Sequence, residues 1–189
     1  MKIVNNADPE VFSSFTSAFS KFSTFLPFSL LTVRTADIRT ESFSDSKAVI
    51  TVPETNDKIL LENMFLSSLN KLELRSKIGS MHPVIEDIIV NRRIASLYQE
   101  EIMYVFSMHL FERRKVIESM EDFLSINIPW LSLYHVDEYK WKYLRKMLEN
   151  FKYEKSYEEK TKKLFPLLKK DLRINDVREK AVKELILLG

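Results

Sequence analysis

The sequence predicts a mainly α protein in which a small N-terminal α/β unit is followed by a C-terminal helical bundle. Between residues 28 and 75, runs of β-branched and alternating residues are bounded by prolines and polar turn residues. From residue 81 onward, the apolar residues recur at helical spacing instead. We therefore expect two domains. Residues 1–78 hold a phenylalanine-rich helix and a small β-containing domain, and residues 79–189 hold the bundle.

The composition excludes several classes of protein and site. The chain has 189 residues, of which 45% are hydrophobic and 30% are charged, so it can bury a real core. Cysteine is absent, which excludes disulfides, cysteine nucleophiles and thiolate metal sites. The two glycines, Gly79 and Gly189, are too few for a phosphate-binding P-loop or a dinucleotide-binding fingerprint. No apolar stretch is long enough to span a bilayer, so we expect a cytoplasmic protein.

The first element is a helix over residues 8–26. It begins with Asp8 and Pro9, an N-cap followed by proline at the first helical position. One face carries phenylalanines at three- and four-residue spacing: Phe12, Phe15, Phe19 and Phe22. Aromatic rings bury a large area, so the first interpretation is that this face docks on the core. The alternative is a stripe that binds a partner protein, with Phe12, Phe15 and Phe19 as the contact residues.

The β unit follows this helix. Residues 28–38 and 48–52 are rich in β-branched residues and predict two strands, with a polar turn over 41–47 between them. Residues 71–75, KLELR, alternate between apolar and polar residues and predict a third strand. Residues 76–80, SKIGS, contain the only internal glycine and predict a linker.

A short helix is expected between the second and third strands. It follows Pro53, and its cap is one of three polar residues: Thr55, Asn56 or Asp57. Its apolar face consists of Ile59, Leu60, Met64 and Leu69.

The bundle is expected to contain several helices. A short first helix is indicated by Val84, Ile85, Ile88 and Ile89, and a long second helix begins near Ile94 and continues to about residue 125. Residues 126–134 form an apolar turn at Pro129, where Trp130 plugs the core. A third helix presents Trp141, Leu144, Leu148 and Phe151 on one face. Another runs through Pro166, and a last helix is capped by Asn175 or Asp176.

No arrangement of residues predicts catalysis or a cofactor. The histidines His82, His109 and His135 lie far apart in the sequence, and none has a metal-ligating partner at helical spacing. The adjacent carboxylate pairs point about 100° apart on a helix, so they do not converge for acid–base chemistry. His135 beside Asp137 and Glu138 is better explained as the polar N-terminus of a helix than as a metal site. We therefore expect a protein that is not an enzyme and holds no metal or cofactor.

Residues 139–170 form the clearest charged stretch, with eleven Lys or Arg and four Glu. Aromatic residues are interleaved with these cations, a pattern that binds single-stranded nucleic acid through phosphate contacts and base stacking. The alternative is an amphipathic helix whose aromatic rings, including Trp141, face the core while its lysines face water. In either case, five cations are the candidates for a nucleic-acid contact: Lys140, Lys142, Arg145, Lys146 and Lys152.

Three segments of the β unit carry a family resemblance. They are AVITVP, DKILLENMFLSSL and KLELR, read as a strand ending in proline, a short helix and another strand. With a linker and a helical bundle after them, they resemble the small subunits of the GINS complex, the replication-fork assembly that accompanies the ring helicase. The closing segment, LKKDLRINDVREKAVKEL, is similar in charge pattern to the family's last helix. The chain departs from the family in lacking a tryptophan soon after Pro53 and in carrying the phenylalanine-rich helix.

The resemblance implies a role. It implies a non-enzymatic, nucleoid-associated scaffold of archaeal type that assembles with a related subunit as a hetero-oligomer. It also implies binding to the replicative helicase and to a RecJ/Cdc45-like partner. On that interpretation, Phe12, Phe15, Phe19, Trp130 and Trp141 are the partner-binding residues. The alternative is a nucleic-acid-binding helical protein, viral or plasmid-borne, that uses residues 139–170.

Overall fold

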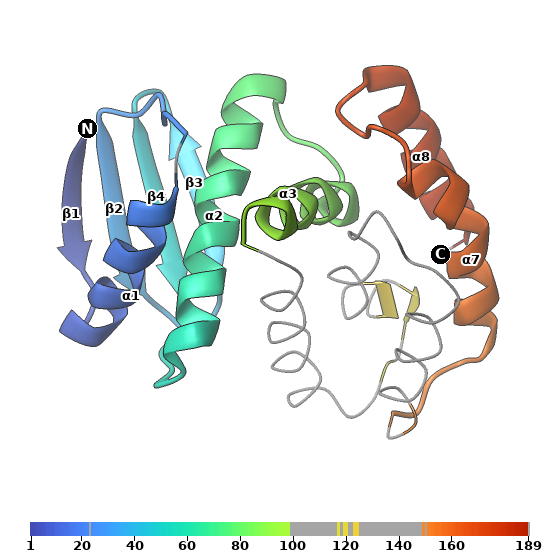
Figure 1. Cartoon of the computed structure of the whole chain (residues 1–189), viewed down its shortest axis with the longest axis horizontal. Helices are drawn as coiled ribbons and strands as arrows, with labels where there is room; N and C mark the ends of the chain where they lie inside the picture. Colours follow the sequence, from blue (N-terminus) through green and yellow to red (C-terminus); the bar gives the residue numbers. More distant parts are fainter. Residues whose placement is uncertain are drawn as a thin grey trace. The chain divides into compact units, whose positions relative to one another are not determined.

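The computed structural model describes residues 1–22, 24–98, 117, 119–120, 123–124, 149 and 151–188 (Figure 1). The chain divides into two compact units, Met1–Ser80 and Met81–Gly189. Each unit is described on its own. Within the described residues, no helix combines the length and the apolar character needed to cross a membrane.

The first unit is built on a four-stranded sheet with the order β1-β2-β4-β3. The strands are β1 (Lys2–Asn6), β2 (Leu30–Thr35), β3 (Thr40–Ser44) and β4 (Lys47–Val52). The pairs β1/β2 and β2/β4 are parallel, whereas β3 pairs with β4 in antiparallel fashion. The turn between β3 and β4 places Asp45 at a φ of 52°, a left-handed conformation that aspartate adopts more readily than most residues.

Two helices, α1 (Pro9–Lys21) and α2 (Lys58–Ile78), cover one face of this sheet (Figure 1). Their contact is centred on Phe15 and Phe65, whose rings meet edge to face at 5.3 Å between centroids. Both rings are fully buried, together with the strand residues Leu31 and Ile50. The Asp57 carboxylate caps α2 by accepting a hydrogen bond of 2.9 Å from the backbone N–H of Leu60.

Several sequence predictions for this unit are confirmed, and others are wrong. The helix after Asp8 and the strands within 28–38 and 48–52 are present, and Asp57 is the cap that α2 uses. The predicted strand 71–75 is wrong, because KLELR lies inside α2. Leu72 and Leu74 are buried in the middle of a helix that is buried almost all around, so the apolar pattern loses its helical period. Strand β1 was not predicted, and the predicted polar turn over 41–47 is wrong because β3 occupies most of it; both strands are short and mostly exposed. The predicted linker over 76–80 is also wrong in part, because α2 continues to Ile78.

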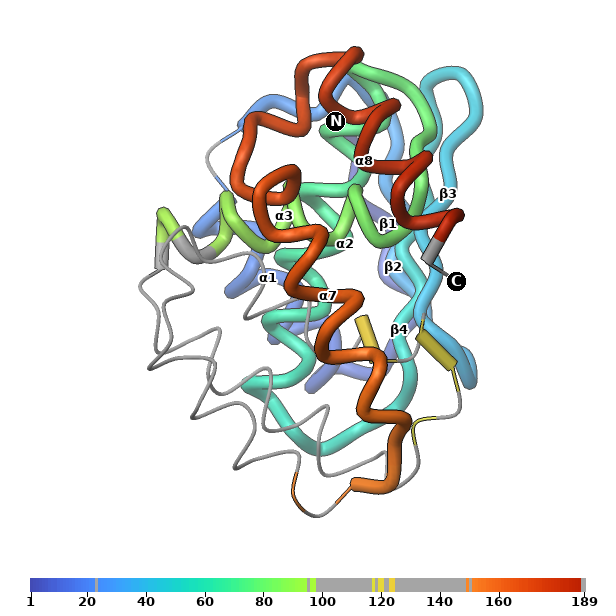
Figure 2. The backbone as a smooth tube through the Cα atoms, turned by 90° about the vertical axis from the view of Figure 1, so that its right-hand side faces the viewer, coloured from blue at the N-terminus to red at the C-terminus, as the bar shows by residue number. Residues whose placement is uncertain are grey.

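The second unit contains α3 (Pro83–Tyr98), α7 (Ser156–Leu168) and α8 (Asn175–Leu188) among its described residues. The apolar residues expected in two separate helices, Val84 to Ile89 and Ile94, all lie in α3. After α7 the chain turns back, so that α8 lies beside it (Figure 2). Helix α3 contacts α8.

The predicted fold class, a mainly α protein with a helical bundle, is wrong. The described chain is an α/β unit plus helices, and its helices do not clearly form a bundle. The sheet is larger than expected because it gains β1 and β3 as its two edge strands. Most of the predicted long helix to residue 125, the turn at Pro129 and the helix bearing Trp141 lie outside the described residues.

Candidate nucleic-acid interface

Positive charge is concentrated on the hairpin formed by α7, α8 and the turn between them. Residues 156–188, which span α7, the turn and α8, contain nine Lys or Arg and six Asp or Glu, a local net charge of +3, whereas the whole chain has a net charge of only +2. Five of these cations have exposed side chains on the two helices and the start of the turn: Lys163, Lys169, Lys170, Lys180 and Lys183. The hairpin therefore presents five exposed lysines on a segment with a net positive charge.

The amphipathic pattern of the hairpin explains this distribution. Leu164 and Leu168 of α7 are buried, as are Ala181 and Leu185 of α8, at spacings that place each pair on one helix face. Leu172 in the turn is also buried. These apolar residues close the hairpin on its inner side, so the lysines between them face solvent.

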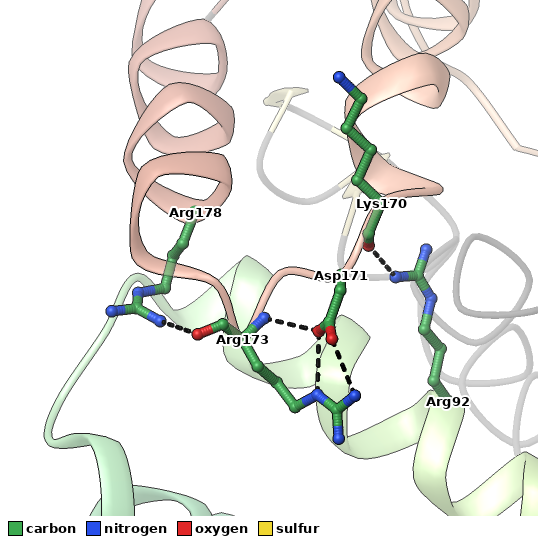
Figure 3. Close-up of polar contacts among 5 residues, drawn as sticks. All are labelled: Arg92, Lys170, Asp171, Arg173 and Arg178. Atoms are coloured by element: carbon green, nitrogen blue, oxygen red, sulfur yellow. Dashed lines mark hydrogen bonds and ion pairs between the residues drawn. The ribbon is translucent and has the colours of Figure 1, made fainter.

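The turn between the helices is held by Asp171. Its carboxylate accepts three hydrogen bonds from Arg173: from the backbone N–H at 3.0 Å, from Nε at 2.9 Å and from Nη2 at 2.8 Å (Figure 3). The last two form a bidentate pair, the geometry in which a guanidinium best matches a carboxylate or a phosphate. Both side chains are exposed, with relative areas of 67% for Arg173 and 43% for Asp171.

A second arginine continues the network into α8. Arg178 donates from Nη1 to the carbonyl oxygen of Arg173 at 3.1 Å (Figure 3). Its Nη2 donates to the Asn175 side-chain oxygen at 2.6 Å, and the Asn175 amide donates to Glu179 at 2.7 Å. The first turn of α8 is thereby tied to the preceding residues, and two guanidinium groups are held at one end of the hairpin.

A third arginine reaches the hairpin from α3. Arg92 donates from Nη1 to the carbonyl oxygen of Lys170 at 3.1 Å (Figure 3). Its Nη2 donates to the carbonyl oxygen of Leu168. These carbonyls belong to the end of α7, where the last turn has no helical N–H partners. A cation also suits the negative end of the helix dipole. Arg92 is buried, so it fixes the end of α7 from within the unit and leaves the lysines exposed.

Arg173 also sets the ionisation of Asp171. Hydrogen bonds from the Arg173 side chain, and then from its backbone N–H, lower the pKa of Asp171 from 3.8 to about 2, against a small opposing effect of burial. The carboxylate is therefore ionised throughout the neutral range.

This arrangement can bind phosphate groups. Lysine ammonium groups neutralise phosphates as point charges, and arginine guanidinium groups bind them through paired hydrogen bonds. Of the two aromatic residues of the hairpin, Tyr157 is buried and Phe165 is half-buried, whereas five of its lysines are exposed. The arrangement thus suits the sugar-phosphate backbone of a duplex better than the bases of a single strand.

Of the predicted partner-binding residues, the structure describes the three phenylalanines of α1. Phe15 is 1% exposed and stacks between Phe12 and Phe19 with ring centroids 5.6 and 5.5 Å apart. Phe12 and Phe19 are half-buried, so the stripe belongs largely to the core of the first unit. Trp130 and Trp141 lie outside the described residues.

Of the predicted nucleic-acid residues, Lys152 is described and has an exposed side chain, whereas Lys140, Lys142, Arg145 and Lys146 lie outside the described residues. The aromatic residues next to Lys152 pack inward. Tyr157 is buried, and the ring of Phe123 contacts Tyr153 and Tyr157 at 5.2 and 5.8 Å. For these two tyrosines, the core interpretation is the better one.

The sequence reasoning missed Arg92, Arg173 and Arg178 as members of a site. The segment RIND, 173–176, was interpreted only as a source of a helix cap, whereas α8 begins at Asn175 itself. An Asp side chain often accepts a hydrogen bond from the backbone N–H two residues on, so Asp171 was a sequence signal for the turn, but not for its pairing with the Arg173 guanidinium. Arg92 lies 76 positions before Leu168, so no local signal in the sequence indicates its contact with the end of α7.

A second polar cluster lies in the first unit, between β3 and α2. The Ser68 hydroxyl donates to Glu41 Oε1 at 2.8 Å, and Arg75 donates to the backbone oxygen of Glu41 at 3.0 Å. Arg39 Nε lies 3.6 Å from the Glu41 carboxylate, and Lys71 is a further nearby cation. Ser68 is fully buried and Lys71 is 6% exposed. The cluster therefore joins β3 to α2 with these two side chains hidden from solvent.

Comparisons with known proteins identify no relative. No protein-family model matches the chain, and searches of curated proteins and of solved structures find no similar protein. Within the described part of the chain, no group of three or more His, Cys, Asp or Glu side chains is placed to hold a metal ion.

Proposed function

We propose that the protein binds nucleic acid non-enzymatically, through the backbone phosphates of double-stranded DNA, with the α7–α8 hairpin as its contact surface. The observation that carries this proposal is the set of five exposed lysines on the α7–α8 hairpin, whose residues 156–188 have a net charge of +3 in a chain whose net charge is +2. A local cationic surface of this kind supplies sequence-independent affinity by releasing counterions from DNA. The proposal places the protein in the cytoplasm, with the nucleoid.

The rigidity of the turn supports this function. Arg92 holds the end of α7, and Asp171 and Arg178 hold the residues before α8. Because the two helices are fixed at this point, their lysines keep a constant spacing, and less entropy is lost when they bind phosphates.

The first test removes three exposed lysines of the hairpin. We expect the variant Lys169→Gln/Lys170→Gln/Lys180→Gln to bind a short DNA duplex on the order of 10²-fold more weakly than the wild type at low salt. All three side chains are exposed, and at Lys180 in α8 glutamine has a helix propensity close to that of lysine, so the fold is preserved. Fluorescence anisotropy of a labelled duplex of mixed sequence measures the affinity.

The matched control changes three exposed lysines of the first unit: Lys2→Gln, Lys47→Gln and Lys58→Gln. This variant has the same net charge as the test variant, and we expect it to bind within about threefold of the wild type. Equal losses in both variants would show that only the net charge matters and would contradict a surface on the hairpin.

A second proposal is a scaffold role in a GINS-like replication complex, and one observation favours a protein partner. Ile186 and Leu187, near the end of α8, are 68% and 78% exposed, so two adjacent large apolar side chains are available to a partner. On this proposal, they bury their side chains against a related subunit, and the assembly binds the replicative helicase and a RecJ/Cdc45-like protein.

The scaffold proposal is tested by purification from the native host. We expect the tagged full chain to retain a related subunit through high-salt washing, and Ile186→Asp/Leu187→Asp to lose it. The control Glu184→Gln changes a neighbouring half-buried residue of α8 and should keep the partner. Retention of no replication protein by the wild type would contradict this proposal and leave the DNA proposal standing.

A further inference from the structure

We propose that Asp171 competes with nucleic-acid phosphate for Arg173, so that the Asp171–Arg173 ion pair lowers the affinity of the hairpin for DNA. This inference rests on the proposed function and concerns the regulation of the same surface. It predicts that Arg173 contributes to DNA binding only after it leaves the Asp171 carboxylate.

The geometry of the pair supports competition. Nε and Nη2 of Arg173 contact the two carboxylate oxygens of Asp171 at 2.9 and 2.8 Å (Figure 3). A phosphate group uses the same edge of a guanidinium for its own bidentate contact. One anion therefore occupies the edge at a time, and Asp171 occupies it in the unbound protein.

The position of the pair allows Arg173 to exchange the Asp171 carboxylate for a phosphate. Both side chains are exposed to solvent, so water and salt screen the pair and a phosphate can reach the guanidinium. The two residues are separated by a single position, so the carboxylate is always available to the guanidinium at high effective concentration. Since the pKa of Asp171 is about 2, the carboxylate stays charged at neutral pH.

The structure also allows the charge to be removed while the turn is retained. The Arg173 backbone N–H donates to Asp171 Oδ1, and an asparagine at this position keeps an oxygen that accepts the same bond. In Asp171→Asn, the turn is preserved and the carboxylate charge is lost.

The test compares Asp171→Asn with the wild type in the full chain, on the same DNA duplex. We expect about threefold to tenfold tighter binding, with a plot of log K against log salt steeper by about 0.9, the value for one additional phosphate contact. The charge-matched control is Asp176→Asn, which removes an exposed carboxylate from the first turn of α8. We expect this control to gain less than about twofold, with an unchanged slope.

A third variant tests whether Arg173 is responsible for the tighter DNA binding of Asp171→Asn. Asp171→Asn/Arg173→Ala should lose the gain and the added slope, because it lacks the guanidinium that becomes available. If Asp171→Asn gains no more than Asp176→Asn, or binds more weakly than the wild type, competition is refuted and the proposed function stands. If the wild type shows no affinity for DNA at low salt, the proposed function fails, and this inference fails with it.

Discussion

Replacing Glu41 by glutamine lowers the free energy of unfolding of the first unit by about 2 to 4 kcal/mol, the largest effect expected for any polar residue of that unit. The Glu41 side chain is 6% exposed and accepts a hydrogen bond from Ser68. It also lies within reach of Arg39 and Arg75, and near the buried Lys71. Without the carboxylate, these cations face one another at the junction of β3 and α2, and removing one partner of a buried ion pair is strongly destabilising.

Chemical denaturation followed by circular dichroism measures this loss, and amide hydrogen exchange of β3 and β4 locates it in the first unit. The matched control is Glu54→Gln, an exposed glutamate in the loop before α2, which should change stability by less than about 0.5 kcal/mol. A Glu41→Gln protein as stable as this control would show that the cluster contributes nothing to the fold.

The same cluster makes stability depend on pH. Burial acts to raise the pKa of Glu41, but Lys71, Arg39, the Ser68 hydroxyl and Arg75 together lower it below its ordinary value of 4.5. The carboxylate is therefore less easily protonated in the folded protein than in the unfolded chain. Its contribution is complete above pH 4.5 and is lost as the pH falls through the folded-state pKa below that value. Glu41→Gln should lack this part of the acid transition.

Replacing Arg92 by methionine is expected to cost about 2 to 4 kcal/mol in the second unit, because it removes charged hydrogen bonds to two carbonyl oxygens. Arg92 is 7% exposed and donates to the backbone oxygens of Leu168 and Lys170. Methionine fills much of the same volume with no donor, so the end of α7 loses its cap. Thermal unfolding with probes in α7 and α8 measures the effect.

The matched control for Arg92 is Lys163→Met, which removes an exposed cation from α7 itself. We expect this control to change stability by less than about 0.5 kcal/mol. If Arg92→Met and Lys163→Met unfold alike, the buried guanidinium does not hold the end of α7. If only Arg92→Met is destabilised, the network behind the hairpin is confirmed as a stabilising element.

Local signals in the sequence predicted the elements that have strong periodicity or caps. The phenylalanine helix, strands β2 and β4 and the Asp57 cap followed from spacing and turn residues that act within a few positions. The strand predicted for KLELR is wrong because α2 is buried almost all around, so its apolar residues mark no single face. Strand β3 was not predicted because its sequence, TESFS, is mostly polar, and it forms a strand only through its pairing with β4.

The candidate site was predictable in part. The sequence located an excess of positive charge in the second half of the chain, and the structure places exposed lysines on α7 and α8. No local signal indicates that Arg92 supports the turn, since that contact joins α3 to α7 across 76 residues. The inward packing of Tyr157 against Phe123 also depends on tertiary structure, and it favours phosphate contacts over base stacking.

The salt dependence of DNA affinity tests the central claim most directly. For the wild type, log K should fall linearly with log salt between about 50 and about 200 mM, with a slope of about −2.7 or steeper, equivalent to three or more phosphate contacts. In Lys169→Gln/Lys170→Gln/Lys180→Gln, the slope should become shallower by about 2.7, while the matched variant of the first unit keeps the wild-type slope. A wild type with no affinity at low salt, or the same slope in all three proteins, would contradict the assignment of the α7–α8 hairpin as a nucleic-acid interface.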